Sequence, residues 1–404
     1  MSVSCDLCDK LFDSDHAVEQ HKRDTYYGNC TTQKKRSRPR NRRKNTQSTP
    51  TYSSIPVSAN GYSSLANWNF NSFFARLGVG VREESQAVAT GRNTVSVDFR
   101  SRVTATDLNS FIAEELQPTE EFNREMQETV GKICEFLRRH MEPDQIVKGG
   151  SLGKGTAVRG RCDIDLVLVL NGVEGAEDLK RKLPEIRVKI KTMLTIYSGG
   201  FTIVPGSLKD SSFLVKFSVK GTHGNIDVDL LPTFKYEDLQ SLYRKMRTDQ
   251  RHSEYYSVAL AQRKVAFVGR QPANVKNLIR LVKYWKKEKV TSMSGGSYLM
   301  ELITIHLWEE NTRYGNGTFD TLKAFHGVMK ALEEYHSLNV IWTTNYSASE
   351  IPHEVKSRPG PLVMDPANPM NNVCTAFDLE RLGRAAREVR RSPMLDGVSS
   401  TSWK

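Results

Sequence analysis

Apolar residues in the middle of the chain follow two different periods. Between residues 106 and 140 they recur three or four positions apart, on either side of a break at Pro118, which predicts two helices. A long section with helical periodicity covers residues 274–340. Between these helical sections, apolar and polar residues alternate as in strands over 162–170, 213–219 and 226–231. Strands mixed with helices, followed by helices alone, predict an α+β fold with a mainly helical C-terminal region.

The first 30 residues carry cysteines and a histidine at the spacing of a metal site. The pattern is Cys5-x2-Cys8-x12-His21-x8-Cys30. Four such ligands can close a tetrahedral Zn²⁺ site, and the metal supplies folding energy that so small a core cannot. We therefore expect a zinc finger of the C2HC type over residues 1–30; the alternative is a disordered leader with coincidental cysteines. Because this segment has a net charge of −3, a protein partner is at least as strongly indicated as nucleic acid.

A basic, polar stretch follows the first segment. Residues 31–80 contain nine Lys or Arg residues and no acid, and eight of the nine lie between Lys34 and Lys44. Such a run repels itself and does not pack, so we expect a disordered linker over residues 31–102. The basic run is typical of a nuclear-import signal or a non-specific RNA clamp, and the simpler alternative is a solubilising spacer. A net charge of +12 for the whole chain favours polyanionic partners: nucleic acid, nucleotides or an acidic membrane surface.

The remaining cysteines and the lack of a long apolar run indicate where in the cell the protein is located. Six cysteines are too few and too scattered for a secreted disulfide framework, and three of them are typical of single buried thiols: Cys134, Cys162 and Cys374. The sequence has no run of about 18 apolar residues, as a membrane span requires, and no apolar signal core at the N-terminus. We expect an intracellular protein without a membrane partner. It would be cytoplasmic, with the nucleus as a second location if the basic run is an import signal.

A glycine-rich turn precedes the first predicted strand. It reads Gly149-Gly150-Ser151-Leu152-Gly153-Lys154-Gly155-Thr156. Glycines at this density let the backbone approach phosphate groups closely, and the hydroxyl of Ser151 could contact a phosphate. In a Walker A loop the Lys is followed directly by Ser or Thr. Because Gly155 stands between Lys154 and Thr156, this turn is a different kind of phosphate-binding candidate.

Two aspartates lie directly after this turn. Asp163 and Asp165 point to the same face of the predicted strand, because side chains alternate along a strand. Adjacent carboxylates repel unless a cation lies between them, and Mg²⁺ prefers one or two carboxylates together with substrate phosphates. The alternative, a pair of exposed strand charges, is disfavoured because the rest of the strand is apolar and unpaired buried carboxylates are costly.

A third carboxylate is needed for a site that holds two metal ions. The segments 213–217 and 226–232 predict a hairpin around a turn at residues 222–225, with Asp227 and Asp229 on one face. By this reasoning either aspartate could be the third ligand.

A helix predicted over residues 274–287 has an apolar and a basic side. Its apolar stripe contains Val275, Leu278, Val282 and Trp285, and its basic stripe contains Lys276, Arg280, Lys283 and Lys287. A solvated face is the usual explanation for such a basic stripe. The alternative is that the stripe faces a triphosphate, which needs positive charge near the three aspartates.

Together these residues resemble the signature of the 2'-5'-oligoadenylate synthetases. The resemblance covers about residues 106–380 and leaves out the finger and the basic linker. Its motifs are the glycine turn with Arg159-Gly160-Arg161-x-Asp163-x-Asp165-Leu166-Val167, then Asp229-x-Leu231-Pro232-x-Phe234, Leu278–Trp285, Tyr298-x-x-Glu301-Leu302 and Asp365-Pro366-Ala367-Asn368-Pro369.

The resemblance implies a fold and an activity. The fold would be a polymerase-β-like nucleotidyltransferase lobe over residues 103–250 and a helical C-terminal lobe over 251–404, with the active site between them. The activity would be polymerisation of ATP into 2'-5'-linked oligoadenylates with release of pyrophosphate, in innate antiviral signalling.

The resemblance also assigns roles to individual residues. Two Mg²⁺ ions would be held by Asp163, Asp165 and Asp229, which selects Asp229 over Asp227. Arg280 and Lys283 would grip the donor triphosphate and Tyr298 would stack on its base. The nucleotide-binding set is completed by Ser151 and by Ser297, which stands where the family usually has Gln.

The family is usually activated by double-stranded RNA. Lys148 and Lys154 match basic positions of the RNA-binding face, and Lys34–Lys44 would assist without sequence preference. Two rival functions stay open at this point. A cyclic-dinucleotide synthase similar to cyclic GMP–AMP synthase shares the fold and the three aspartates, although this chain lacks the Cys-Cys pair of the vertebrate form. A catalytically inactive RNA-binding scaffold would be expected to lose an aspartate, and none is lost.

Overall fold

The computed structural model describes residues 97–160, 163–197, 199–291, 293–312 and 319–403, together with the short strands at residues 3–4 and 11–12. The chain divides into two compact units, Met1–Trp68 and Asn69–Lys404. In the first unit, Val3–Ser4 (β1) pairs antiparallel with Leu11–Phe12 (β2). The predicted zinc ligands Cys5, Cys8, His21 and Cys30 lie outside the described residues, as do Lys34–Lys44 and the linker up to residue 96.

The second unit is built on a five-stranded sheet with the strand order β3-β4-β7-β6-β5. The central pair, β4 and β7, is parallel, and the other pairs are antiparallel. The predicted hairpin is confirmed, with Gly221 opposite Gly224. The strands are β3 (Gln145–Lys148), β4 (Ile164–Leu170), β5 (Lys209–Asp210), β6 (Val215–Gly221) and β7 (Gly224–Phe234).

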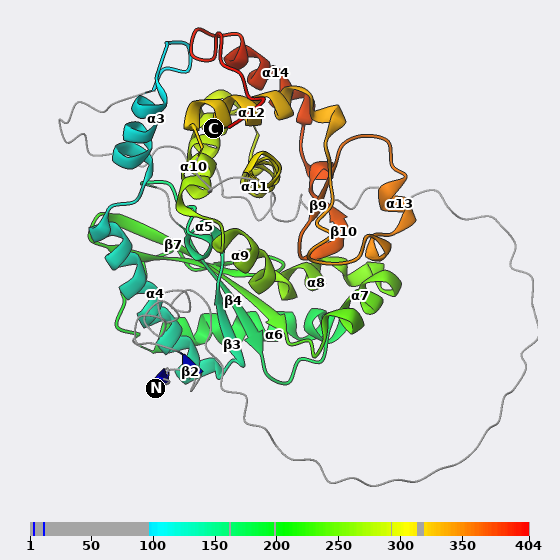
Figure 1. Cartoon of the computed structure of the whole chain (residues 1–404). Coiled ribbons are helices and arrows are strands. Elements are labelled where there is room, and N and C mark those ends of the chain that lie inside the picture. Colours follow the sequence, from blue (N-terminus) through cyan, green and yellow to red (C-terminus); the bar gives the residue numbers. More distant parts are fainter. Residues whose placement is uncertain are drawn as a thin grey trace, which may run out of the picture. The chain divides into compact units, whose positions relative to one another are not determined.

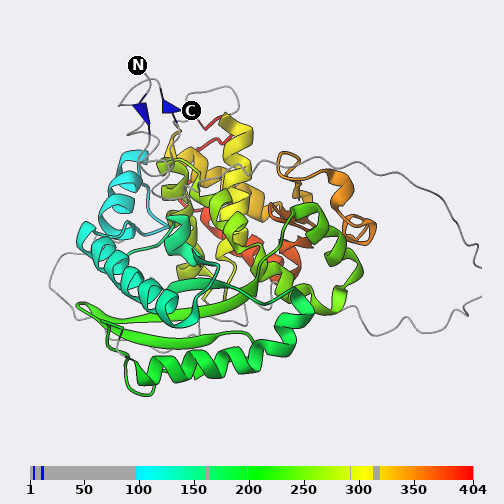
Figure 2. The same cartoon turned by 90° about the horizontal axis from the view of Figure 1, so that it is seen from below.

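The two faces of the sheet have different partners. The even-numbered residues of β4, from Ile164 to Leu170, belong to the main core together with residues of α4 (Glu120–Met141) and α6 (Ala176–Ile196). Figure 2 shows α6 lying along this face. On the opposite face, Val167 belongs to a smaller cluster with Val147, Leu214, Leu231 and Val258. Because Asp163 and Asp165 share the odd-numbered positions of Val167, they lie on that opposite face.

The predicted break at Pro118 separates the two helical segments that precede the sheet. The helix α3 (Ala105–Phe111) begins at a capping box of Thr104 and continues as a π-helical turn over Ile112–Leu116. After Pro118, Thr119 caps α4 by accepting a hydrogen bond from the Phe122 N–H. The folded body starts before residue 103, because Phe99 is buried and its ring lies 5.9 Å from those of Tyr284 and Phe325. The end of the predicted linker is therefore part of the core.

The C-terminal lobe is mainly helical, as predicted, and lies above the sheet in Figure 1. It also contains a small sheet with the order β10-β9-β8, which the sequence did not predict. Its strands are β8 (Asn339–Val340), β9 (Leu362–Asp365) and β10 (Asn368–Asn372). The helices after the central sheet are α7 (Leu239–Thr248), α8 (Ser253–Ala259), α9 (Ala261–Gly269), α10 (Ala273–Lys289), α11 (Ser297–Thr312), α12 (Thr321–Glu333), α13 (His353–Lys356) and α14 (Leu379–Arg390).

Two smaller sequence predictions concern thiols and membranes. Cys134 and Cys374 are free buried thiols, as predicted, and burial raises the pKa of Cys374 to about 12. Cys162 lies outside the described residues. Within the described ranges, none of the helices combines the length and the apolar character that crossing a membrane requires.

The same substitution at two valines tests the assignment of core and surface. Val219 on β6 is fully buried, whereas Val188 on α6 is 62% exposed. We expect Val219→Ala to lower the free energy of unfolding by about 1–3 kcal/mol, because two methyl groups leave a packed core. Val188→Ala should change it by less than about 0.5 kcal/mol. Urea unfolding followed by circular dichroism measures both, and equal losses would contradict the described packing.

Candidate active site

The register of the two parallel central strands brings two of the predicted aspartates together. Asp165 on β4 lies directly beside Asp229 on β7, and their side chains project from the same face. Asp163 precedes the first residue of β4 and lies on that face two residues earlier. The sheet therefore places the three predicted carboxylates next to one another.

Asp227, the alternative third ligand, has different surroundings. It is exposed, and its carboxylate accepts a hydrogen bond from the Ser218 hydroxyl across the hairpin. The Asp229 side chain is 19% exposed, and its Oδ2 lies 3.0 Å from the Lys216 ammonium. Position therefore favours Asp229, which pairs in register with Asp165.

Burial and mutual repulsion make this carboxylate cluster unfavourable by itself. Burial, followed by the charges of Asp229 and Asp163, raises the pKa of Asp165 to about 7. The pKa of Asp163 is raised by burial and by the charges of Asp227 and Asp229. Burial also raises the pKa of Asp229, although Lys216 opposes this shift. A positive charge placed between the carboxylates would relieve the repulsion.

The donor set of this cluster fits a hard divalent cation. Its ligands are carboxylate oxygens, which suit Mg²⁺. The Lys216 ammonium beside Asp229 already supplies part of the positive charge that the cluster needs. Among the residues that the structure describes, no group of three or more His, Cys, Asp or Glu side chains, these aspartates included, is placed as a ready-made metal site. Mg²⁺ does not require one, since it takes a few carboxylates and completes its shell with water and substrate phosphates.

The glycine turn packs directly against Asp165. It forms the short helix α5 (Gly150–Lys154), and the Gly149 N–H donates a hydrogen bond of 2.7 Å to the Asp165 carbonyl oxygen. A Cβ on Gly150 would lie 1.7 Å from Asp165 Oδ2, and Gly150 has a φ of +56°. Only glycine fits this position, for both steric and conformational reasons. Ser151 follows in the same turn and is partly exposed.

A buried charge cluster lies where α5 meets the C-terminal lobe. Glu301 on α11 is 1% exposed, and its carboxylate lies 2.8 Å from Lys154 Nζ and 2.5 Å from Lys283 Nζ. It also accepts a hydrogen bond of 2.9 Å from the Thr156 hydroxyl. Burial alone would raise the pKa of Glu301, but the two ammonium groups lower it to about 2. Two lysines and one glutamate leave this cluster with one net positive charge.

The basic stripe of α10 faces protein rather than water. The Arg280 guanidinium donates hydrogen bonds of 2.7 and 2.8 Å to the carbonyl oxygens of Gly155 and Ala157. Lys276 donates a hydrogen bond of 2.6 Å to the Gly269 carbonyl oxygen. Lys287, at the end of the stripe, is exposed. The solvated-face explanation therefore holds only for Lys287.

Tyr298 lies beside this cluster at the start of α11. Its hydroxyl donates a hydrogen bond of 3.1 Å to Asp365 Oδ1, and the Lys154 ammonium lies 4.3 Å from the centre of its ring. Ser297, the first residue of the helix, is exposed.

The residues predicted for RNA binding do not share one environment. Lys148 is exposed at the end of β3, one residue before the glycine turn. The Lys154 side chain is only 14% exposed and is paired with Glu301. The structure therefore places Lys154 with the predicted nucleotide-binding residues, apart from Lys148.

Three contributors to the site had no role assigned from sequence: Glu301, Thr156 and Lys216. A signal was present for two of them. Glu301 lies three residues after Tyr298, so both fall on one side of a helix. Lys216 lies opposite Asp229 in the hairpin register. No local pattern indicates that Thr156 donates a hydrogen bond to Glu301.

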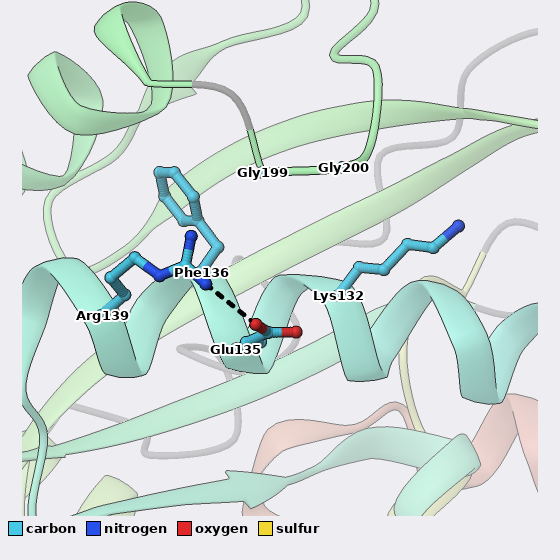
Figure 3. Close-up of a pocket in the computed structure, with 6 residues that line it drawn as sticks. All are labelled: Lys132, Glu135, Phe136, Arg139, Gly199 and Gly200. Atoms are coloured by element: carbon cyan, nitrogen blue, oxygen red, sulfur yellow. Dashed lines mark hydrogen bonds and ion pairs between the residues drawn. The ribbon is translucent and has the colours of Figure 1, made fainter.

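A separate surface hollow lies away from these residues. It is lined by Lys132, Glu135, Phe136 and Arg139 of α4 and by Gly199 and Gly200 (Figure 3). Arg139 points back along its own helix to Glu135, at 3.0 Å. A Cβ on Gly199 would lie 2.9 Å from the Phe136 ring, so glycine lets this turn approach the helix. Of the predicted site residues that the structure describes, none lines the hollow.

Comparisons with known proteins agree with this arrangement. Residues 233–404 match the family described as 2'-5'-oligoadenylate synthetase 1, domain 2, C-terminus. The 2'-5'-oligoadenylate synthase 1A of Mus musculus is 28% identical over 309 residues, which cover 67% of this chain and 83% of that protein. The inactive 2'-5'-oligoadenylate synthase 1B of Mus musculus is 27% identical over 346 residues, 76% of this chain and 90% of that protein.

A solved structure shows the same fold. The structure of E. coli MS115-1 CdnC with ATP is similar at a TM-score of 0.52 and 21% identity, and the match covers 75% of this chain and 99% of CdnC. The predicted polymerase-β-like nucleotidyltransferase fold is thus confirmed.

Replacing one carboxylate tests the charge repulsion in the cluster. Because the folded-state pKa of Asp165 is raised to about 7 from about 3.9 in an unfolded chain, the folded protein loses stability as the pH rises through this window. Without metal at pH 8, Asp165→Asn should therefore increase the free energy of unfolding, by at most about 4 kcal/mol at roughly 1.4 kcal/mol per pKa unit.

The measurement is denaturant unfolding with EDTA at pH 8 and pH 4. The gain should shrink at pH 4, where wild-type Asp165 is largely protonated in the folded state. The matched control is Asp227→Asn, which should give a smaller gain: Asp227 adds to the repulsion at Asp163, but it is itself exposed. A destabilised Asp165→Asn variant at pH 8 would contradict the cluster.

Proposed function

We propose that this chain is a nucleotidyltransferase of the 2'-5'-oligoadenylate synthetase type, which polymerises ATP and releases pyrophosphate. The observation that carries the proposal is the register of β4 and β7, which sets Asp165 beside Asp229 with Asp163 adjacent. The relatives include a named synthase and a named inactive protein. Retention of all three aspartates, on one face and against a glycine turn, supports an active enzyme.

Asp163, Asp165 and Asp229 would hold two Mg²⁺ ions. When bound, the metals would make the acceptor 2'-hydroxyl more acidic and neutralise charge on the α-phosphate of the donor ATP. For its carboxylate to bind metal, Asp229 would have to exchange its present contact with the Lys216 ammonium. The raised pKa of Asp165 means that this carboxylate would bind metal more weakly below about pH 7, where it carries a proton.

The basic half of the site would bind the donor triphosphate. Ser151 offers a hydroxyl at the glycine turn. Arg280 keeps donors beyond those bound to Gly155, Ala157 and Asn277, because a guanidinium has five. Lys283 would contribute charge, although it is now held by Glu301 and Thr156. The donor base would stack on the ring of Tyr298, next to the exposed Ser297.

Double-stranded RNA is the proposed activator, bound at the face that contains Lys148. This lysine is exposed and directly precedes Gly149, which hydrogen-bonds the backbone of Asp165. A contact at Lys148 could therefore shift the glycine turn against the aspartate. A zinc finger formed by Cys5, Cys8, His21 and Cys30 stays a prediction. We propose that the finger and the basic run Lys34–Lys44 assist binding without taking part in the chemistry.

The central test compares Asp229 with Asp227, which lies two positions earlier on the same face of β7. Asp229→Asn should reduce product formation at least about 100-fold, because the charge stabilisation supplied through a metal ligand is worth several kcal/mol. Asp227→Asn should stay within about tenfold of wild type, since such an exposed residue is expected to add little. Purified full-length protein is incubated with ATP and Mg²⁺, with and without duplex RNA, and the linkage in the product is identified by nuclease digestion.

The outcomes separate the rival functions. Loss of activity in Asp227→Asn but not in Asp229→Asn would move the third ligand to Asp227. A cyclic product would identify a cyclic-dinucleotide synthase. No product under any condition, from folded protein, would favour the inactive scaffold.

A charge reversal tests the RNA-binding face. Lys148→Glu should weaken duplex RNA binding and reduce the slope of log affinity against log salt by roughly 0.7–0.9 for the lost phosphate contact. The matched control is Lys330→Glu on α12, which reverses another exposed charge, in the helical lobe. Affinity and ATP turnover are measured against RNA and salt concentration. Equal effects of the two variants would indicate non-specific attraction rather than a face at Lys148.

A further inference from the structure

We propose that Asp365 is a positioning residue for the donor nucleotide, which fixes the ring of Tyr298 and is itself held by Lys264. This inference rests on the proposed function, because Tyr298 is taken as the residue that stacks on the donor base. Its basis is a closed series of buried contacts that joins the glycine turn to the small sheet of the C-terminal lobe.

The carboxylate of Asp365 is fully buried, and both of its oxygens are engaged. Oδ1 accepts hydrogen bonds from the Tyr298 hydroxyl at 3.1 Å and from the Ala367 N–H at 2.9 Å. Oδ2 lies 3.2 Å from Lys264 Nζ and 3.4 Å from the Asn371 side-chain nitrogen. With partners on both oxygens the carboxylate has one orientation, and so does the hydroxyl that it binds.

Lys264 explains why a buried carboxylate is tolerated here. Its side chain is 11% exposed, and its ammonium also donates a hydrogen bond of 2.7 Å to the Ser257 hydroxyl. A buried charge is costly unless it is paired and hydrogen-bonded, and this pair meets both conditions. Lys264 belongs to α9, whereas Asp365 ends β9, so the pair ties two distant segments together.

Two sets of contacts connect Lys264 and Tyr298 to the glycine turn. Helix α9 packs against α5, where a Cβ on Gly153 would lie 3.4 Å from a methyl group of Val265. On the other side, the Lys154 ammonium of α5 lies over the Tyr298 ring. The ring is therefore fixed at its hydroxyl by Asp365 and at its face by α5. Without the hydroxyl contact, the ring could rotate away from the position that meets a base.

The test measures nucleotide affinity, which a purely structural role would not change in a folded variant. Full-length wild type, Tyr298→Phe, Asp365→Asn and the double variant are titrated with Mg²⁺ and α,β-methylene-ATP, which cannot be transferred, in a calorimeter. Each single variant should bind roughly tenfold more weakly or worse, as expected for loss of a hydrogen bond to a charged group. The double variant should be no weaker than the weaker single variant, because both changes act on the same contact: Phe lacks the donor, and Asn offers only a neutral acceptor.

A matched pair elsewhere in the chain supplies the control. Tyr256 donates a hydrogen bond of 2.9 Å to Asp249. Tyr256→Phe removes and Asp249→Asn weakens the same kind of contact away from the proposed nucleotide-binding residues, so both should leave the affinity for the analogue unchanged.

The double variant Lys264→Met/Asp365→Asn separates positioning from folding. It leaves no unpaired buried charge, so its unfolding midpoint should recover relative to Lys264→Met alone, while its nucleotide affinity stays low. Recovery of affinity together with stability would overturn the inference. So would wild-type affinity in Tyr298→Phe, a variant that keeps the ring and can be tested even if Asp365→Asn does not fold. Wild-type protein that binds no analogue would overturn the proposed function as well, which distinguishes the two failures.

Discussion

The placement of like charges on one sheet face is the constraint on which the rest of the site depends. Two carboxylates directly side by side, with a third adjacent, repel each other, and burial adds to the cost, as the pKa of about 7 for Asp165 shows. The sheet holds them there because the opposite face of β4 is packed into the main core. A slip of one residue between β4 and β7 would turn aspartates into the main core and apolar residues out of it, so packing fixes the register that brings the charges together.

One positive charge contacts these aspartates directly, and two others lie beyond the glycine turn. Lys216 is in direct contact with Asp229, whereas Lys154 and Lys283 are held by Glu301 on the far side of the glycine turn. Glu301 allows two ammonium groups to lie close together in a buried place without strong repulsion. The free protein thus has an acidic half and a basic half with α5 between them. A nucleotide carrying metal would have complementary charge for both halves.

The glycine turn is also where the two lobes meet. Its carbonyl oxygens bind Arg280 from α10, and Lys154 and Thr156 bind Glu301 from α11. Its other side packs against Asp165 so closely that no side chain fits at Gly150. A movement of the helical lobe relative to the sheet would therefore be transmitted through the glycine turn to the aspartates. This is a physical route by which binding at a distant face could change the geometry of the site.

The periodicity of the sequence was sufficient to predict elements that form from contacts between residues close together in the chain. The alternation around Asp163 and Asp165 predicted β4, and the turn at residues 222–225 predicted the hairpin of β6 and β7, because hairpin pairing is local. The apolar stripe of α10 predicted that helix for the same reason, and all of its members are buried. The sequence did not predict α6 or the small sheet in the C-terminal lobe. Strands β8 and β9 show why: they pair across more than 20 residues, which no local period encodes.

Residue identity determined which chemistry the chain can carry, and the tertiary structure decided which residues act together. Alternation alone left Asp227 and Asp229 equivalent, and only pairing with β4 gives Asp229 a carboxylate neighbour. Charge alone made Lys148 and Lys154 similar, but one is exposed and the other is paired with Glu301, 147 residues away. Asp365 and Lys264 likewise meet from distant parts of the chain. Such pairs form because burying a charge requires a partner, and that partner is found only when distant segments pack together.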